Sequence, residues 1–295
     1  MSPVNPANPA DRNPANPSNS TPPVNPANAS NSADADKSKL SQAVQAQFSR
    51  QAARYEQSPV HARGEDLAWA VEAANLTGVE RVLDVGTGTG HTAFAMAPHC
   101  RSVMGLDLTA RMIVSAASLA DEKELANVQF VVSDGASMPF PDAYFDVVTT
   151  RLAAHHFADP EAVATEMARV LRPGGRLVFV DHVAPPNSSL DSFINRIDWL
   201  RDSSHVREWT VKEWIDRFAA NGVDLAVHRE YALPLDFRWW IEQAATPEDR
   251  MAQLIQMFGS ADEEAKRTFH IQLDDLGLPV AFALQSVVLA GNKRG

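Results

Sequence analysis

The chain has a single cysteine and no excess of positive charge, and both shortages exclude classes of protein. Cys100 cannot form a disulfide within the chain and cannot supply a cysteine-rich metal site. Asp and Glu outnumber Lys and Arg by 37 to 26, for a net charge of −11. DNA grooves and anionic membranes are bound through clustered Lys and Arg, so we expect no nucleic-acid partner and no membrane partner.

Long hydrophobic runs are also missing. No stretch of roughly 18 apolar residues occurs, so no transmembrane helix is expected. The first residues show no secretory signal, and the lone cysteine fits a reducing compartment. We therefore expect a cytoplasmic location. The hydrophobic content of 45% is enough to build a core.

Residues 1–36 lack aromatic side chains and have few aliphatic ones. The motif Pro-Val-Asn-Pro-Ala-Asn occurs at residues 3–8 and again at residues 23–28. A segment of this composition cannot bury enough apolar surface to offset the entropy lost on ordering. The sequence therefore predicts a disordered tail over 1–36 and a folded domain over 37–295.

A glycine-rich stretch at residues 82–90 predicts a ligand site. An aliphatic run reads as a buried strand, and Gly86, Gly88 and Gly90 follow it as a turn leading into a helix. A helix N-terminus after such a turn presents bare backbone N–H groups, as in the nucleotide sites of doubly wound α/β folds. Asp107 lies about 20 residues further on, after a second apolar run, where an acid meets ribose hydroxyls.

The spacing of these glycines separates two cofactor classes. The dinucleotide fingerprint needs a small residue at position 91, where this chain has His91. The pattern here is Asp84-x-Gly-x-Gly-x-Gly, which resembles motif I of class I S-adenosylmethionine-dependent methyltransferases. A NAD-binding oxidoreductase is the less favoured alternative.

The downstream segments extend this resemblance. Strands are predicted at residues 103–107, 128–132 and 147–150, alternating with helical stretches, which indicates βαβ units and a parallel sheet. The segments 134–146, 151–159 and 171–176 follow the glycine turn in the order of the ubiquinone/menaquinone-biosynthesis-type methyltransferases, which they resemble over residues 82–182. The resemblance implies a doubly wound, Rossmann-like sheet of seven mostly parallel strands. Residues 280–289 can supply its antiparallel last strand, with residues 223–231 before it.

Three segments lie outside the expected core of residues 64–185, 210–235 and 276–295. A helix over 38–57, with Phe48 and Tyr55 on its apolar face, resembles the cap that many small-molecule methyltransferases fold over the cofactor. Two aromatic-rich helical insertions, 186–209 and 236–275, are predicted to form a lid over the substrate. Ordinary helical insertions or a homodimer surface would show similar faces, so all three interpretations stay open.

The resemblance also assigns a cofactor site. It implies that Asp107 accepts the ribose hydroxyls, that Asp134 meets the adenine amino group, and that Asp84 orients the glycine turn. The candidate cofactor-binding residues are Asp84, Gly86, Gly88, Gly90, Asp107, Leu108, Asp134, Gly135, Ala136 and Arg151.

Catalytic residues are sought at the end of the fourth strand. His155 and His156 follow that strand, and an imidazole there could act as a general base, although a turn cap or a packed side chain is the plainer interpretation. His182, which follows Asp181, ends the fifth strand on the same side. No recognised ligand spacing supports a metal site.

The acceptor is expected to be a small molecule methylated on carbon, oxygen, nitrogen or sulfur. Its candidate contacts are Tyr55, Arg201, His205 and Trp239. A non-catalytic S-adenosylmethionine-binding sensor or scaffold is the alternative from a different class.

Overall fold

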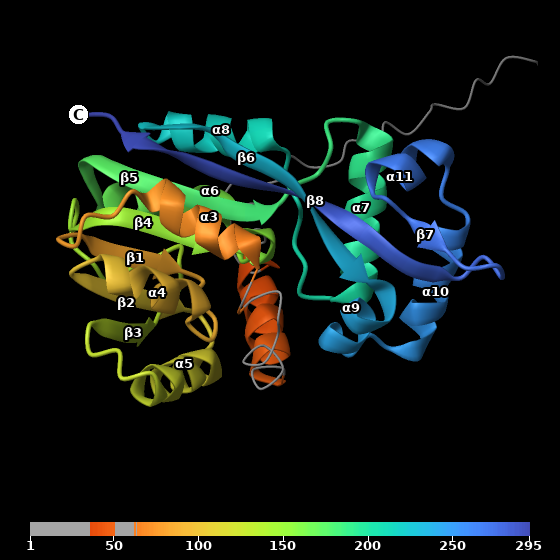
Figure 1. Cartoon of the computed structure of the whole chain (residues 1–295), viewed down its shortest axis with the longest axis horizontal. Helices are drawn as coiled ribbons and strands as arrows, with labels where there is room; N and C mark the ends of the chain where they lie inside the picture. The colour runs from red at the N-terminus through yellow and green to blue at the C-terminus, as the bar shows by residue number, and fades with distance from the viewer. Residues whose placement is uncertain (1–35, 51–61, 63) are drawn as a thin grey trace, which may run out of the picture. The chain divides into compact units, whose positions relative to one another are not determined.

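The central sheet has the strand order β3-β2-β1-β4-β5-β8-β6 in the computed structural model, which describes residues 36–50, 62 and 64–295 (Figure 1). Contacts within the chain separate residues 1–36 from residues 37–295. The strands are β1 (Arg81–Val85), β2 (Ser102–Asp107), β3 (Val128–Val132), β4 (Phe145–Arg151), β5 (Leu171–His182), β6 (Val223–Asp236), β7 (Gln272–Leu273) and β8 (Pro279–Lys293).

The strand directions confirm the predicted fold class. The pairs β1–β2, β1–β4, β2–β3 and β4–β5 are parallel, whereas β8 runs antiparallel to both β5 and β6. The chain leaves β1 to one side through β2 and returns to its other side through β4. The carboxyl ends of β1 and β4 therefore flank the crevice in which open α/β sheets bind ligands. A short strand that was not predicted, β7, pairs with β8.

Helices cover both faces of the sheet. The helices are α3 (Glu65–Ala74), α4 (His91–Met96), α5 (Ala110–Glu122), α6 (Pro160–Val170), α7 (Ser188–Arg201), α8 (Val211–Ala220), α9 (Phe237–Ala244), α10 (Glu248–Gly259) and α11 (Glu263–Thr268). Residues 36–50 are also helical.

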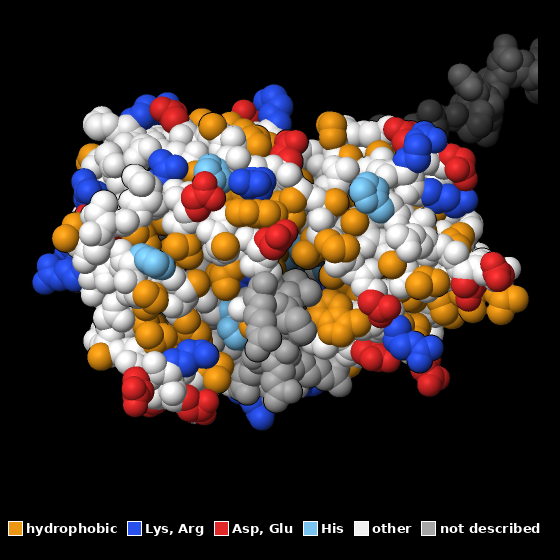
Figure 2. Space-filling view, in the orientation of Figure 1, with side chains coloured by type: hydrophobic (Ala, Val, Ile, Leu, Met, Phe, Trp, Pro, Cys, Tyr) orange, Lys and Arg blue, Asp and Glu red, His pale blue; other side chains and the backbone are white. Residues whose placement is uncertain are grey.

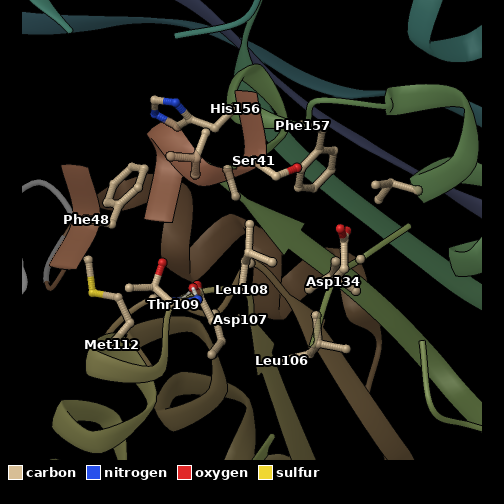
Figure 3. Close-up of a pocket in the computed structure, with 18 of the residues that line it drawn as sticks. Ser41, Phe48, Leu106, Asp107, Leu108, Thr109, Met112, Asp134, His156 and Phe157 are labelled. Carbon is tan, nitrogen blue, oxygen red and sulfur yellow. Dashed lines mark hydrogen bonds between the residues drawn. The ribbon is translucent and has the colours of Figure 1, made fainter. Parts of the chain in front are cut away.

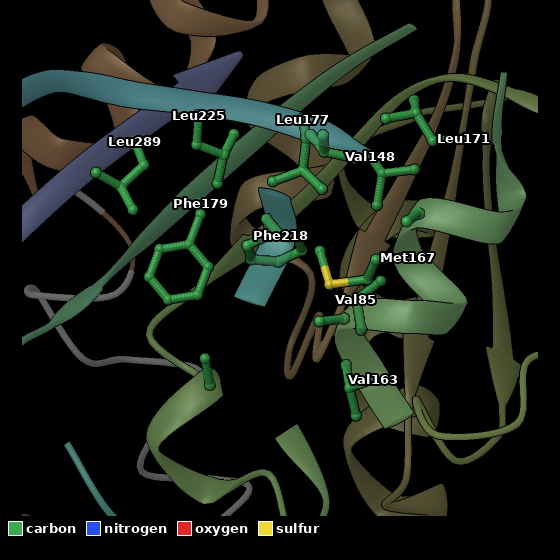
Figure 4. Close-up of a cluster of buried hydrophobic side chains, with 14 of the residues drawn as sticks. Val85, Val148, Val163, Met167, Leu171, Leu177, Phe179, Phe218, Leu225 and Leu289 are labelled. Atoms are coloured by element: carbon green, nitrogen blue, oxygen red, sulfur yellow. The ribbon is translucent and has the colours of Figure 1, made fainter. Parts of the chain in front are cut away.

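Two hydrophobic clusters hold the helices on the sheet. On one face, Met167 of α6 and Phe218 of α8 pack with Phe179 of β5 (Figure 4). A second cluster joins the small residues of α3 and α4 to strand residues such as Val82 and Val178. These strand residues are fully or almost fully buried, which explains why β1, β4 and β5 read as continuous apolar runs rather than alternating ones.

A third hydrophobic cluster lies where β6 ends and β8 begins (Figure 1). It is formed with four helices, called here the insertion helices: α7, α9, α10 and α11. Trp240 of α9, Phe258 of α10 and Phe282 of β8 meet edge to face in it. Truncating a buried aromatic of this kind costs about 3–5 kcal/mol. The strands β6 and β8 run past the sheet because they also form the platform for these helices.

The described surface carries mixed charge. On the face in Figure 2, the described Lys and Arg side chains alternate with Asp and Glu rather than gathering into one basic area. None of the helices in the described ranges is long and apolar enough to cross a membrane.

Candidate active site

The glycine turn between β1 and α4 is shaped by left-handed backbone. Gly86 has φ +71° and Gly88 has φ +55°, conformations that residues with a Cβ rarely adopt. The N–H groups of Gly86 and Thr87 both donate to the carbonyl of Leu106, which ties the turn to the end of β2. A Cβ on Gly86 would lie 2.5 Å from that of Ala153, whereas a Cβ on Gly88 would meet nothing within 4 Å. Gly86 therefore permits close packing, and Gly88 borders open space.

Asp84 supports this turn from inside the sheet. Its side chain is buried and accepts a hydrogen bond from the hydroxyl of Thr87 at 2.6 Å. Burial raises the pKa of Asp84 to about 7. Neither Asp84 nor Gly90 is among the residues that line the adjoining cavity.

That cavity has a volume of about 420 Å³ and lies at the carboxyl ends of β1, β2, β3 and β4 (Figure 3). It is called the first cavity below. Asp107 enters it from the end of β2, and Asp134 from the loop after β3. Ser41 and Phe48 of the helix over residues 36–50 border it as well.

The carboxylate of Asp107 is fixed by backbone groups. One oxygen accepts from the N–H of Gly88 at 2.8 Å, and the other accepts from the N–H of Thr109 at 2.8 Å. Burial raises the pKa of this carboxyl. Asp134 is held in a similar way by the N–H of Ala136 at 2.8 Å.

The other residues predicted to bind the cofactor also lie at the first cavity. Gly86, Gly88, Leu108, Gly135, Ala136 and Arg151 line the first cavity together with the two aspartates. Arg151 is also bound in an ion pair, because its Nε lies 2.6 Å from the carboxylate of Asp66 and both side chains are almost inaccessible to solvent. Met112 lines the cavity from α5 and was missed by the sequence analysis, although its place in the first turn after Thr109 was a usable signal.

A second, smaller cavity of about 50 Å³ adjoins the first. Phe48, Leu152 and His156 line both cavities. Three residues predicted to contact an acceptor, Arg201, His205 and Trp239, also line the second cavity. Arg201 ends α7 and Trp239 belongs to α9, so both predicted insertions reach it. Tyr55 lies outside the described residues.

Four histidines surround the second cavity: His155, His156, His182 and His205. The ring centroids of His155 and His156 are 4.2 Å apart. Burial lowers the pKa of His155 well below its ordinary value, and it lowers the pKa of His182 and of His205 to about 3. His155, His182 and His205 are therefore neutral at neutral pH.

Oxygen atoms orient three of these rings. Nδ1 of His155 lies 2.6 Å from Oδ1 of Asp181. Nδ1 of His156 lies 3.0 Å from the carbonyl oxygen of Ser204, which can only accept, so this nitrogen carries the hydrogen. Nε2 of His205 is 3.1 Å from Oδ1 of Asn195.

The described part of the chain contains no arrangement of side chains suited to a metal ion. No group of three or more His, Cys, Asp or Glu side chains there is placed to hold a metal ion. Beside the second cavity, Oδ2 of Asp202 has no hydrogen-bond partner among the described residues, whereas Oδ1 is engaged by protein groups. Oδ1 accepts from both the N–H and the hydroxyl of Ser204.

Comparison with known proteins identifies the family. Residues 83–179 match the model of a methyltransferase domain. The chain is 42% identical over 247 residues to the uncharacterized methyltransferase YcgJ of Bacillus subtilis, covering 84% of this chain and 98% of that protein. The chain belongs to the methyltransferase family.

Solved structures and other relatives agree with this assignment. The crystal structure of YcgJ superposes with a TM-score of 0.77 at 41% identity and covers 78% of this chain and 99% of its own. A demethylmenaquinone methyltransferase of Deinococcus radiodurans is 38% identical over 168 residues, covering 55% of this chain and 69% of that protein. The methyltransferase fold implied by the sequence resemblance is therefore confirmed.

The cofactor of this methyltransferase is S-adenosylmethionine, and the residues of the first cavity fit it. The open space beside Gly88 admits a ligand against bare backbone. The two carboxylates, Asp107 and Asp134, offer acceptors for hydroxyl and amino hydrogens, while Leu106, Met112 and Val163 offer apolar walls. S-adenosylmethionine, when bound, supplies an electrophilic methyl group on a sulfonium.

Proposed function

We propose that this methyltransferase transfers the methyl group of S-adenosylmethionine to a small molecule bound in the second cavity. The supporting observation is that the two cavities meet at Phe48, Leu152 and His156. A donor in the larger cavity and an acceptor in the smaller one would thus face each other across a short, partly apolar junction. Holding two reactants in this way contributes much of the rate enhancement in methyl transfer.

In this proposal the residues of the first cavity bind the cofactor. Asp107 accepts hydrogen bonds from the ribose hydroxyls, and Asp134 accepts one from the adenine amino group, with the backbone of Gly135 and Ala136 beside it. Gly86 and Gly88 let the cofactor approach the main chain, and Asp84 holds the turn in shape through Thr87. Arg151 contributes a fixed positive charge, which its pairing with Asp66 moderates.

The residues of the second cavity bind the acceptor and accept its proton. Arg201 has no carboxylate within 4.0 Å among the described residues, and its Nε donates to the carbonyl of Trp240 at 3.1 Å. Its guanidinium lies over the ring of Trp240, and no described residue accepts a hydrogen bond from its terminal nitrogens, which we assign to an acceptor oxygen. His205 and Trp239 complete the wall, and His155 or His156 acts as the general base. We also propose that the segments 186–209 and 236–275 form the lid over this acceptor.

A small acceptor agrees with the names of the relatives. Several are named demethylmenaquinone methyltransferases. The sensor and oxidoreductase alternatives gain no support from these comparisons, and the homodimer remains a prediction.

Calorimetric titration followed by a turnover assay tests the proposal. We expect S-adenosylmethionine and S-adenosylhomocysteine to bind and NAD not to bind. A panel of hydroxyl, amine and thiol acceptors should then yield S-adenosylhomocysteine with at least one class. Binding of NAD in preference to S-adenosylmethionine would contradict the proposal, and tight cofactor binding without turnover of any class would favour a sensor.

A further inference from the structure

Asp181, at the end of β5, is the most heavily engaged carboxylate beside the second cavity. One oxygen accepts from the N–H of His182 at 2.8 Å and lies 2.6 Å from Nδ1 of His155. The other accepts from the N–H of Ala154 at 2.6 Å and from the N–H of His155 at 3.2 Å. Asp181 is 1% exposed. It therefore holds both the backbone and the ring of His155.

These contacts determine where the hydrogen of His155 resides. Burial raises the pKa of Asp181, but three backbone N–H groups donate to its two oxygens, which opposes this rise and leaves the carboxylate an acceptor toward the imidazole. The neutral ring of His155 then carries its hydrogen on Nδ1 and a lone pair on Nε2. Nε2 has no hydrogen-bond partner among the described residues. His155 lines the second cavity, and its side chain keeps 13% of its exposure.

We propose that His155 is the general base of this methyltransferase, that Asp181 is its positioning residue, and that the acceptor reacts through a phenolic or enolic hydroxyl. The inference rests on the proposed function, because it assumes that the second cavity holds the acceptor. It goes further by choosing between the two adjacent histidines and by naming the acceptor's chemistry.

The acceptor class follows from what an oriented neutral imidazole can do. A phenolic hydroxyl has a pKa near 10 and is a weak nucleophile while it keeps its proton, so it benefits from a base. A carboxylate is ionised at neutral pH, and a neutral amine attacks with its own lone pair. A base held by a buried carboxylate is therefore matched to a hydroxyl acceptor.

The reaction balances as follows for an oxygen acceptor. The hydroxyl proton passes to Nε2 of His155 while an oxygen lone pair forms the bond to the methyl carbon. The carbon–sulfur bond breaks, and its electron pair stays on sulfur. For an enol or phenol methylated on carbon, the same proton leaves and the ring or enol carbon supplies the bonding pair. The positive charge left on His155 faces the carboxylate of Asp181.

The protonation of His155 also depends on the other charged and titratable groups around it. These are His156 on its own turn, Asp181 and His182 from β5, Arg201 and Asp202 at the end of α7, and His205 in the following segment. Burial lowers the pKa of His155 well below its ordinary value. His155 should therefore stay unprotonated throughout the neutral range, so its protonation should not lower kcat/KM there.

Replacement of Asp181 by asparagine separates positioning from a purely structural role. The amide oxygen of Asp181→Asn can take the place of the oxygen that accepts from the N–H groups of Ala154 and His155, whereas the N–H of His182 loses its acceptor. The amide nitrogen would donate to Nδ1 of His155 and move the ring hydrogen to Nε2, which removes the base. The matched control is Asp262→Asn, because Asp262 also accepts from a backbone N–H, that of Ala265 at 2.7 Å, but caps α11 away from both cavities.

The test uses substituted phenols of graded acidity, with 4-nitrophenol as the most acidic. At pH 8, Asp181→Asn should lower kcat/KM for the least acidic phenol by about 10²–10⁴-fold, and the loss should shrink toward 4-nitrophenol, which is mostly ionised at that pH. Nitrogen NMR should show the hydrogen of His155 on Nδ1 in the parent protein and on Nε2 in the variant, without any turnover. Asp262→Asn should change neither measurement.

Each other outcome decides against a defined part of the inference. An equal loss for every phenol, or an unchanged nitrogen spectrum, overturns the positioning role. Methyl transfer to amines or thiols but to no phenol or enol overturns the hydroxyl assignment, while the proposed function stands. Failure of the parent protein to bind S-adenosylmethionine overturns the proposed function itself. If Asp181→Asn does not fold, His155→Gln must show the same acidity-dependent loss, and an acidity-independent loss overturns the assignment of the base.

Discussion

At the scale of single residues, the two aspartates of the first cavity are set in place by the backbone. Both oxygens of Asp107 are held at 2.8 Å by N–H groups, one from the glycine turn and one from Thr109. This preorganised carboxylate loses little freedom when a ligand binds, which favours affinity. It also means that a change at Asp107 acts on the turn as well as on the ligand.

We predict that Asp107→Ala weakens binding of S-adenosylmethionine by about ten- to a hundredfold. The lost charge-assisted hydrogen bonds correspond to about 1.5–3 kcal/mol. Isothermal titration calorimetry measures the effect, and Asp262→Ala, which removes a cap from α11, serves as the control. Unchanged affinity in a folded Asp107→Ala protein would remove this residue from the ribose site.

The buried histidines predict acid sensitivity of the cofactor-free fold. The pKa of His182 falls from its ordinary 6.5 to about 3, so the unfolded chain binds this proton in a range where the native protein does not. The stabilising contribution is thus complete above about pH 6.5 and is lost as the pH falls toward 3, by up to about 1.4 kcal/mol per pH unit. Asp84 acts in the opposite direction, because its raised pKa of about 7 lowers stability as the pH rises from about 4 to 7.

Urea unfolding at several pH values checks the histidine contribution. His182→Gln keeps a polar group near the hydroxyl of Ser286, which lies 3.0 Å from Nδ1 of His182, but cannot titrate. Its free energy of unfolding should depend less steeply on pH between 6.5 and 3 than that of the parent protein. Asp84 is present in both proteins, so its effect cancels when their free energies of unfolding are subtracted. If the free energy of unfolding depended equally on pH in both proteins, the prediction would be contradicted.

At the scale of elements, the glycine turn predicts two different kinds of damage. Gly86→Ala would place a methyl group 2.5 Å from Cβ of Ala153 in a left-handed conformation, so we expect a loss of stability of about 1–3 kcal/mol. Gly88→Ala meets no atom within 4 Å, so it should cost less stability but place its methyl group where the cofactor is proposed to bind. Thermal unfolding should therefore show the larger loss of stability for Gly86→Ala, and titration should show the larger loss of cofactor affinity for Gly88→Ala. If the same variant showed both larger losses, this division of roles would be contradicted.

The sequence predicted those features of the elements that depend on residues close together along the chain. Asp107 is the last residue of β2 and Asp134 lies just after β3, so their place at one edge of a parallel sheet could be predicted. The pairing of Arg151 with Asp66 joins residues 85 positions apart, and that of His155 with Asp181 joins residues 26 apart. No local period encodes such partners, and the two-residue strand β7 is too short to show one.

At the scale of the whole molecule, we expect the helix over residues 36–50 to matter for the site and residues 1–36 not to. Val44 and Gln47 of this helix are 8% exposed, and Phe48 meets the ring of His156 edge to face at 4.8 Å. Ser41, Val44 and Phe48 line the first cavity. The helix therefore contributes to the site, whereas the Pro- and Asn-rich composition of residues 1–36 offers almost nothing to bury.

We predict that removal of residues 1–36 leaves the methyltransferase intact and that removal of residues 1–50 does not. A chain beginning at Lys37 keeps the ion pair of that residue with Asp159 at 2.6 Å, and its melting temperature should change by less than about 2 °C. A chain beginning at residue 51 loses the wall that Val44 and Phe48 give to the first cavity, so it should bind S-adenosylmethionine at least about tenfold more weakly. Differential scanning calorimetry and titration of both truncations provide the comparison. If removal of residues 1–36 alone lowered the melting temperature by several degrees, this segment would have to stabilise the fold. That result would contradict the prediction, which rests on the lack of side chains to bury in residues 1–36.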